Sequence, residues 1–310
     1  MKNLKIHFLN TLWSDAIILE SNKKYGFVDT GSQFYYPMIK NHLNERNITN
    51  LEFIILTHFH SDHYGNIVNL INDYSVKKLY LKRYYGLDGT TASGYASNEE
   101  YIEHEFGKYY QILDICKEKS VDVIFIDELG VESYELHFEA VTLELFDIKN
   151  MLYQLYSDPE SEFYQQKPFN ENFNSIGIFI NVNNNHIFLG GDATCSATNI
   201  IPLQELSIKM INKYYQKYNI NHIDIYKSCH HGGGGTNTLA LCKLLNANFA
   251  IITNTDRWLD NWPTISNLQE ANKDVVVCKT DYNKYIFEIT DKISYETINE
   301  DSLFLTLKKN

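Results

Sequence analysis

The sequence lacks the long apolar segments of membrane proteins. No hydrophobic run approaches the roughly 20 residues that a helix needs to cross a bilayer. Residues 1–8 have the pattern of a strand, with no uninterrupted apolar segment and no small-residue cleavage site. We therefore expect no membrane association and no signal peptide.

Paired cysteines are also lacking. The sequence has an odd number of widely scattered cysteines without any Cys-x-x-Cys pair, namely Cys116, Cys195, Cys229, Cys242 and Cys278. This arrangement favours free thiols in a reducing compartment over a disulfide framework. The sequence therefore predicts a cytoplasmic protein.

Positive charge is scarce. The chain has 27 Lys and Arg against 39 Asp and Glu, which gives a formal net charge of −12. Nucleic-acid surfaces need basic charge, and only Lys227 and Arg257 lie close to the motifs described below. Long nucleic acid is therefore an unlikely partner and a small-molecule substrate is expected, whereas the oligomeric state stays open.

Repeats, low-complexity runs and Gly/Ser/Pro-rich linkers are absent from the sequence. Its 310 residues are 44% hydrophobic and 21% charged, which is ordinary for a globular protein with a large core. Short strand-like runs alternate with helical patterns in both halves. We predict one domain over residues 1–310, with two packed sheets flanked by helices and a helical embellishment at about residues 83–120.

Some elements are predicted individually. Residues 51–57 are nearly all apolar, as in a strand buried on both faces. A helix is expected at about residues 62–72. A second helix is expected to reach about residue 119, and it opens with a capping box made by Ser97 and Glu100.

The segment Thr57-His58-Phe59-His60-Ser61-Asp62-His63 places three imidazoles and a carboxylate directly after the strand predicted at residues 51–57. Imidazole and carboxylate groups are ligands of zinc and similar divalent ions. His58 and His60 can converge on one metal as the chain leaves the strand. Asp62 and His63, at the start of the next helix, can face a second metal.

Two more polar segments follow predicted strands. Gly190-Gly191-Asp192 presents a carboxylate after two glycines, which permit a close approach to a metal. His230 and His231 precede the glycines at residues 232–235, whose backbone N–H groups can face an anion. Asp29, in an Asp-Thr-Gly segment, is open to a simpler interpretation as the cap of a turn.

Taken in order, these segments resemble those of the metallo-β-lactamase-fold hydrolases. The similarity is greatest to a soluble branch related to the ComEC/Rec2 competence proteins. Residues 13–19 resemble its Gly-Asp-Ala strand motif, and residues 226–232 resemble its Lys-x-x-His-His-Gly-Ser motif, with Gly233 in place of the serine. The membrane part of competence proteins is missing, so DNA uptake is not implied. The resemblance implies an α/β fold, a four-layer αββα sandwich.

The resemblance further implies a site for two divalent metal ions, with zinc favoured and manganese or iron as alternatives. Its ligands would be His58, His60, Asp62, His63, Asp192 and His231. The first two histidines would bind the first metal, the next two residues would bind the second, and Asp192 would bridge both.

Two ligand assignments stay open. His231 is favoured over His230 because family ligands at this point commonly precede a glycine, and His230 would then donate a proton. A third histidine for the first metal has no clear counterpart. His104 and His137 lie in the intervening stretch, but neither has a convincing strand–glycine context.

The implied reaction is hydrolysis by a metal-bound hydroxide. Two ions about 3.5–4 Å apart would lower the pKa of the bridging water to roughly 7. Asp62 would orient the hydroxide, His230 would protonate the leaving group, and the amides of residues 232–235 would stabilise the developing charge. A small phosphodiester or phosphate ester is the favoured substrate. Lactone, thioester or β-lactam hydrolysis and mononuclear iron redox chemistry on the same fold are the alternatives.

Overall fold

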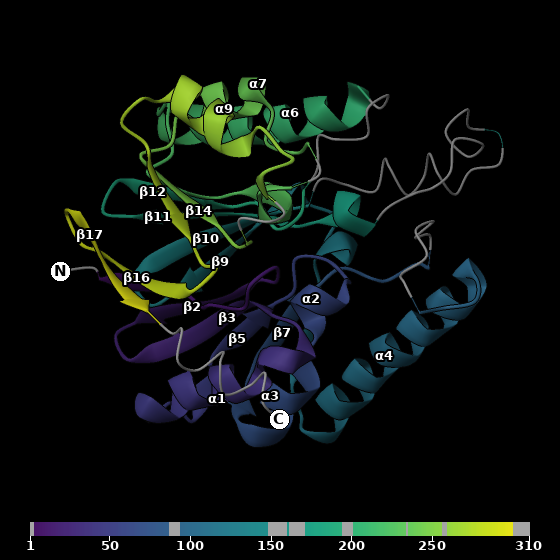
Figure 1. Ribbon diagram of the computed structural model, residues 1–310. Coiled ribbons are helices and arrows are strands. Elements are labelled where there is room, and N and C mark those ends of the chain that lie inside the picture. The colour runs from purple at the N-terminus through teal and green to yellow at the C-terminus, as the bar shows by residue number, and fades with distance from the viewer. Residues whose placement is uncertain are drawn as a thin grey trace.

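The computed structural model describes residues 3–86, 94–147, 160, 171–193, 201–233, 235–255 and 259–299. Within this part of the chain, two large sheets face each other, and each carries helices on its outer side (Figure 1). The layers run helix, sheet, sheet, helix. This arrangement confirms the predicted α/β class and the four-layer αββα sandwich.

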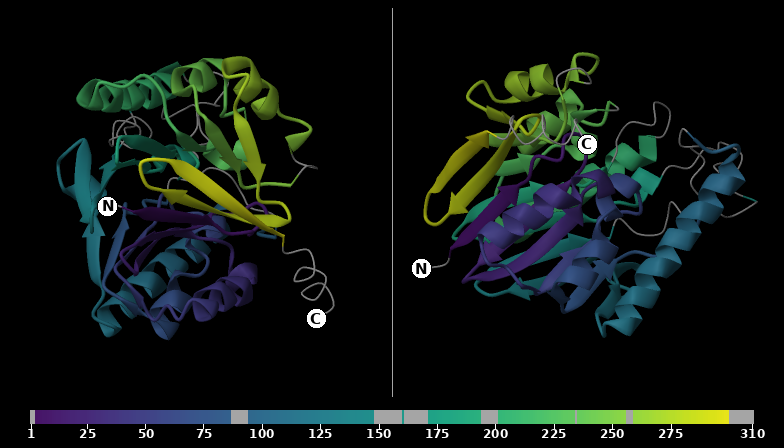
Figure 2. Two further views of the ribbon diagram at one scale, coloured as in Figure 1. Left: turned by 90° about the vertical axis from the view of Figure 1, so that its left-hand side faces the viewer. Right: turned by 60° about the horizontal axis from the view of Figure 1, so that its bottom comes forward.

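The first sheet combines the N-terminal strands with two strands from the C-terminal part of the chain, in the order β17-β16-β1-β2-β3-β5-β7-β8. The strands β3, β5, β7 and β8 are parallel, and the remaining neighbours are antiparallel. Because β16 pairs with β1, the two ends of the described chain share one sheet (Figure 2). The strands are β1 (Leu4–Phe8), β2 (Ala16–Ser21), β3 (Lys24–Thr30), β5 (Phe53–Ile55), β7 (Lys78–Leu81), β8 (Asp122–Phe125), β16 (Asn283–Ile289) and β17 (Ile293–Asn299).

The second sheet has the order β15-β14-β13-β12-β11-β10-β9. Its strands β12 to β15 are parallel, while β9 to β12 form an antiparallel meander. The turn between β11 and β12 places Asn183 and Asn184 at φ of 51° and 61°, a conformation that asparagine tolerates. The strands are β9 (Ser133–Phe138), β10 (Val141–Phe146), β11 (Gly177–Val182), β12 (Asn185–Leu189), β13 (Ile225–Lys227), β14 (Phe249–Ile252) and β15 (Val276–Lys279).

Helices cover the outer face of each sheet (Figure 1). The first sheet carries α1 (Tyr36–Glu45), α2 (Ser61–Tyr64), α3 (Ile67–Asp73) and α4 (Asn98–Glu118), and the second carries α6 (Ile201–Tyr218), α7 (Leu239–Leu245) and α9 (Thr264–Ala271). Short 3₁₀ helices are η1 (Gln33–Tyr35), η2 (Ile126–Glu128), η4 (Glu171–Asn174) and η5 (Cys229–Gly232), and β4 (Asn50–Leu51) pairs with β6 (Ser75–Val76). In the described part of the chain, no helix is both long and apolar enough to span a membrane.

The strand β5 explains why the central strands are apolar on both faces. Phe53 and Ile55 point into the core between the two sheets, whereas Ile54 points into the core beneath the outer helices. Side chains of a strand alternate between its two faces, so a strand covered on both sides needs apolar residues at every position. The sequence pattern at residues 51–57 has this origin, although the regular strand is shorter than predicted.

The helix predicted at residues 62–72 is wrong in one respect, because α2 and α3 are separate helices. The Asn66 side chain donates hydrogen bonds to the carbonyl oxygens of Thr30, Gly31 and Ser32 at 2.7, 3.2 and 2.9 Å. At Gly65, an added Cβ would lie 2.6 Å from the Gly31 carbonyl oxygen. The chain therefore turns here so that it can pack against the end of β3.

The capping box of α4 is confirmed. The Ser97 hydroxyl accepts a hydrogen bond from the Glu100 backbone N–H at 3.2 Å. The carboxylate of Glu100 accepts one from the Ala96 backbone N–H at 2.7 Å. These contacts satisfy backbone donors at the beginning of the helix.

Candidate metal centre

The predicted ligands meet at the edge where parallel strands of both sheets end. Asp29 lies near the end of β3, and residues 57–63 follow β5. Asp192 follows β12, and His230 with His231 follows β13. The carboxyl ends of neighbouring parallel strands lie at one edge of a sheet, so these distant segments converge.

Asp192 lies at the centre of the group. Its Oδ1 atom is 3.4 Å from His63 Nε2, and its Oδ2 atom is 3.5 Å from His231 Nε2. The same Oδ2 atom is 3.9 Å from both His58 Nε2 and His230 Nε2. One buried carboxylate is thus approached by four imidazoles.

Asp62 completes the densest part of this cluster. Its Oδ2 atom lies 3.2 Å from His231 Nε2 and 3.8 Å from His63 Nε2. Asp62, His63, Asp192 and His231 offer ligand atoms that all lie within 4.8 Å of one another. The structure therefore brings together the four residues expected around the second metal.

The two histidines expected at the first metal are also neighbours. His58 Nε2 and His60 Nδ1 lie 3.1 Å apart, and His58 Nδ1 lies 3.1 Å from the Thr57 hydroxyl. His58 is buried, whereas His60 is half-buried at the beginning of α2. His58 contacts the other candidate ligands through Asp192, at 3.9 Å, and through His63, whose ring centroid lies 4.1 Å from that of His58.

An unusual backbone conformation presents two consecutive histidines to the same carboxylate. His230 and His231 have φ values of 49° and 53°, in the left-handed region. This region costs a residue with a side chain roughly 1–2 kcal/mol, and such strain is concentrated at functional sites. The His231 ring is buried, while the His230 ring is 34% exposed and lies 3.2 Å from Asn172 Nδ2.

Two buried carboxylates outside the predicted ligand set orient the ligand histidines. Asp29 Oδ2 accepts a hydrogen bond from His63 Nδ1 at 2.8 Å, and Asp15 Oδ1 lies 3.2 Å from His231 Nδ1. A carboxylate on Nδ1 directs the Nε2 lone pair of a histidine toward a metal. Asp15, Asp29 and His63 also lie close together. Asp29 already accepts the hydrogen bond from His63, and Asp15 already pairs with the Lys227 ammonium, so this group needs no metal ion. Asp29 is therefore more than the cap of a turn.

Lys227, at the end of β13, is fully buried among these groups. Its ammonium forms an ion pair with Asp15, donates a hydrogen bond to the Gly191 carbonyl at 3.2 Å and lies 3.9 Å from Asp192 Oδ1. The sequence reasoning did not assign a role to Asp15 or Lys227. The signal was present, because both lie within the motifs that carried the family resemblance.

The charges in this cluster favour cations at the histidine rings. Burial would lower the pKa of His231, but the carboxylates of Asp192 and Asp15 outweigh it and raise the pKa to about 9. Burial would raise the pKa of Asp192, but the imidazoles of His231 and His63 hold that pKa well below its ordinary value. Negative charge therefore dominates the space between the rings.

Comparison with known proteins decides the fold. Residues 14–137 match the family model of the metallo-β-lactamase superfamily. The metallo-β-lactamase fold protein YhfI from Bacillus subtilis superimposes with a TM-score of 0.54 and 11% identity, over 93% of this chain and 100% of that one. The chain has the metallo-β-lactamase fold. This confirms the fold predicted from the sequence motifs.

Other solved structures of this superfamily are more distant. A mutant form of a metallo-β-lactamase from Cronobacter sakazakii has a TM-score of 0.42 and 10% identity, over 71% of this chain and 75% of that one. An archaeal superfamily protein from Sulfolobus tokodaii has a TM-score of 0.36 and 15% identity, over 71% of this chain and 76% of that one. No curated protein matches the sequence.

The structure also bears on the glycine backbone N–H groups at residues 232–235 and on the two other histidines, His104 and His137. The backbone N–H of Gly233 donates to the His230 carbonyl at 2.7 Å, so it is not free to bind an anion, and Gly234 lies outside the described residues. His104 lies on α4 beside Glu105, and His137 is exposed on β9. Neither histidine contributes to the group around Asp192 in the described part of the chain.

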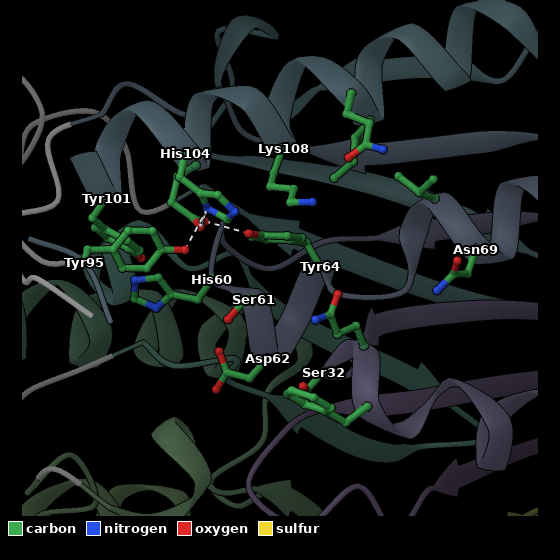
Figure 3. A pocket seen from close by; sticks show the side chains of 17 residues that line it. Ser32, His60, Ser61, Asp62, Tyr64, Asn69, Tyr95, Tyr101, His104 and Lys108 are labelled. Carbon is green, nitrogen blue, oxygen red and sulfur yellow. Dashed lines mark hydrogen bonds and ion pairs between the residues drawn. The ribbon is translucent and has the colours of Figure 1, made fainter. Parts of the chain in front are cut away.

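A cavity of about 700 Å³ adjoins this edge of the metallo-β-lactamase fold. His60 and Asp62 form part of its wall, and α4 forms another part (Figure 3). Small-molecule sites have volumes of about 300–1,000 Å³. The candidate ligands therefore border a space large enough for a small organic molecule.

Proposed function

We propose that this protein is a metal-dependent hydrolase that cleaves a small phosphodiester or phosphate ester. The observation that carries the proposal is Asp192, whose two carboxylate oxygens lie 3.4–3.9 Å from the Nε2 atoms of four histidines. Among the described residues, neither Asp192 Oδ1 nor His63 Nε2 has a hydrogen-bond partner, although both atoms are buried. A divalent cation would satisfy both, since carboxylate and imidazole are its usual protein ligands.

The donor set fits two ions that share Asp192. Asp62, His63 and His231 would hold one, and His58 with His60 would hold the other. Zinc suits this mixture of imidazole and carboxylate ligands, as do manganese and iron. When bound, such ions lower the pKa of a water molecule and offset negative charge that develops on the substrate.

The chain's own groups supply orientation and proton transfer. Asp29 and Asp15 hold Nδ1 of His63 and His231, and this keeps both Nε2 atoms directed at Asp192. Asp62 is an acceptor at the rim of the cavity and would orient the attacking water. His230, a third exposed beside the site, would donate the proton that the leaving group needs.

Two observations support the finer assignments. Asp15 and Lys227, which come from the two motifs similar to the ComEC/Rec2-related branch, meet in a buried ion pair, and this favours membership of that branch. Four buried cysteines, Cys116, Cys229, Cys242 and Cys278, form no disulfide bond within the described residues. Cys195 lies outside the described residues. Free thiols are typical of a reducing compartment, so we assign the protein to the cytoplasm.

A mononuclear iron redox enzyme is the second candidate. It is favoured by one observation, which is that the compact ligand group of the described residues contains Asp62, His63, Asp192 and His231 but neither His58 nor His60. Elemental analysis of protein purified without added metal separates the two candidates. Two zinc or manganese ions per chain would support the hydrolase, and one iron would support the redox enzyme.

The hydrolase is tested with chromogenic small phosphodiesters, lactones and thioesters beside duplex and single-stranded DNA. We expect small phosphodiesters to be cleaved faster than DNA, because a net charge of −12 repels polyanions. Asp192→Asn should abolish cleavage and lower metal content. His137→Ala is the matched control, since this histidine is exposed on β9. Cleavage of long nucleic acid alone, or full activity of Asp192→Asn, would refute the proposal.

A further inference from the structure

The helix α4 presents a polar stripe to the cavity beside the metal centre. Its buried face, with Tyr109, Ile112 and Cys116, packs into the core over the first sheet. Positions three to four residues apart share one side of a helix. The polar residues of α4 that line the cavity follow this spacing, with Ile112 at their border to the core, and they are Tyr101, His104, Glu105, Lys108 and Gln111. These residues line one side of a concave space of about 700 Å³ that opens to solvent.

The acidic residue of the stripe, Glu105, is already hydrogen-bonded to neighbouring side chains. Glu105 is 2% exposed, and its carboxylate accepts a hydrogen bond from the Tyr64 hydroxyl at 2.8 Å. Its other oxygen lies 3.0 Å from His104 Nδ1. Tyr64 follows the ligand His63 directly and stacks on Phe59 with ring centroids 4.3 Å apart. Glu105 therefore braces the ligand loop and is not free to bind a cation.

The basic member of the stripe is available. Lys108 is half-buried, and it makes neither a hydrogen bond nor an ion pair within the part of the chain that the structure describes. Figure 3 shows its side chain extending from α4 into the cavity toward Tyr64. It is the one Lys or Arg among the described residues that line this space. An ammonium held in a concave site without a carboxylate partner is suited to bind an anion.

Aromatic rings complete the wall. Phe34 lines the cavity although it is 72% exposed, which is unusual for a phenylalanine. Tyr95 lines the same cavity, and its hydroxyl lies 3.0 Å from His104 Nδ1. Tyr95 also contacts the rings of Tyr101 and His104, and exposed aromatic rings at a cavity wall offer stacking surfaces for a planar group.

We propose that this cavity is a recognition subsite, in which Lys108 binds an anionic group of the substrate and Phe34 and Tyr95 flank a planar ring. The inference rests on the proposed function, because it places the scissile ester at Asp192 and the second anionic group beside α4. It narrows the substrate class to small phosphate esters that carry a planar ring and a second negative charge. A nucleoside with phosphates at both the 3′ and 5′ positions has this chemistry.

The test compares thymidine 3′,5′-bisphosphate with thymidine 3′-monophosphate and thymidine 5′-monophosphate by isothermal titration calorimetry of the metal-loaded protein. We expect the bisphosphate to bind about tenfold more tightly than either monophosphate, as for one additional charge-assisted contact at a half-buried site. Lys108→Gln should remove this preference, and Lys108→Arg should retain it. Lys117→Gln, a change of the same charge at an exposed position of α4, is the control and should leave the preference intact.

The outcomes separate the subsite from the proposed function. Equal binding of the bisphosphate and both monophosphates, or a preference that survives Lys108→Gln, would overturn the subsite even if phosphodiesters are hydrolysed. A preference lost only in Lys108→Gln supports the subsite. Suppose the protein shows this binding preference and yet hydrolyses no p-nitrophenyl ester of a thymidine phosphate with zinc or manganese. In that case the proposed function is wrong, whereas the subsite is supported.

Discussion

The buried ion pair between Asp15 and Lys227 allows a quantitative test of how the metal centre is held in place. Asp15 is 1% exposed and Lys227 is 0% exposed, so neither charge reaches water. Removal of one partner leaves the other charge buried with a remaining neighbour, His231 beside Asp15 or Asp192 beside Lys227. Loss of a partner from a buried pair costs about 3–5 kcal/mol. We expect Lys227→Met and Asp15→Asn each to lower the free energy of unfolding of the metal-free protein by this amount.

The double variant Asp15→Asn/Lys227→Met should be far less destabilised than the sum of the single variants. It leaves no unpaired charge, and the amide oxygen of asparagine can still accept the hydrogen bond that Thr253 Oγ1 donates at 2.6 Å. Replacement of a whole buried pair by groups of similar volume is often nearly neutral. The coupling energy of the cycle is therefore expected to be at least about 3 kcal/mol.

Urea denaturation followed by far-UV circular dichroism gives the unfolding free energies, and competition with a chelator gives the metal affinity. Because Asp15 orients His231, the double variant should fold yet bind metal about 10–100-fold more weakly. Single variants that each cost less than about 1 kcal/mol, or a cycle whose energies simply add, would refute the reasoning.

Three other perturbations probe separate parts of the structure. His231→Ala should lose metal, whereas His230→Ala should keep metal and lose rate; elemental analysis with steady-state kinetics decides this, and the reverse pattern would exchange the two roles. Tyr64→Phe removes the hydrogen bond to the buried Glu105 carboxylate and should cost about 1–3 kcal/mol in urea denaturation, against no change for the exposed Tyr110→Phe. Burial lowers the pKa of His42 to about 2, so the folded protein keeps this ring neutral while the unfolded chain gains a proton below pH 6.5. The neutral His42 ring therefore contributes to the free energy of unfolding above pH 6.5, and this contribution should fall by up to about 1.4 kcal/mol per pH unit as the pH is lowered. A His42→Gln variant whose free energy of unfolding has the same pH slope between pH 6.5 and 5.5 would contradict this.

The grouping of the candidate ligands could be predicted because its signal is local. His58, His60, Asp62 and His63 lie within one short segment, and the spacing alone indicates a shared site. Their proximity to Asp192 follows from a general property of parallel strands, whose carboxyl ends lie at one edge of the sheet. Both inferences need only the order of strands and loops.

The supporting residues were harder to predict because their partners are remote in sequence. Thr253 donates its hydroxyl to Asp15 across 238 positions, and a short loop before β2 gives no sign of this. A fully buried lysine such as Lys227 runs against the usual exposure of its type. Only the packed structure shows that Asp15 neutralises it.

The prediction of secondary structure failed where tertiary contacts outweigh the local sequence pattern. Residues 62–72 have a helical pattern, yet three carbonyl groups near the end of β3 bind the Asn66 side chain and divide the helix. No strand was predicted for β17, whose side chains are mostly exposed and which is held by its pairing with β16. In both places, the deciding partner lies elsewhere in the chain.

The most direct test of the central claim is a crystal structure of the zinc-loaded protein with anomalous diffraction measured on both sides of the zinc edge. Two zinc ions that share Asp192 should give two anomalous peaks, both within ligand distance of this carboxylate. One should also contact Asp62, His63 and His231, and the other should contact His58 and His60. Peaks that do not involve Asp192, or no anomalous peak at this edge of the sheets, would show that Asp192 is not the centre of a metal site.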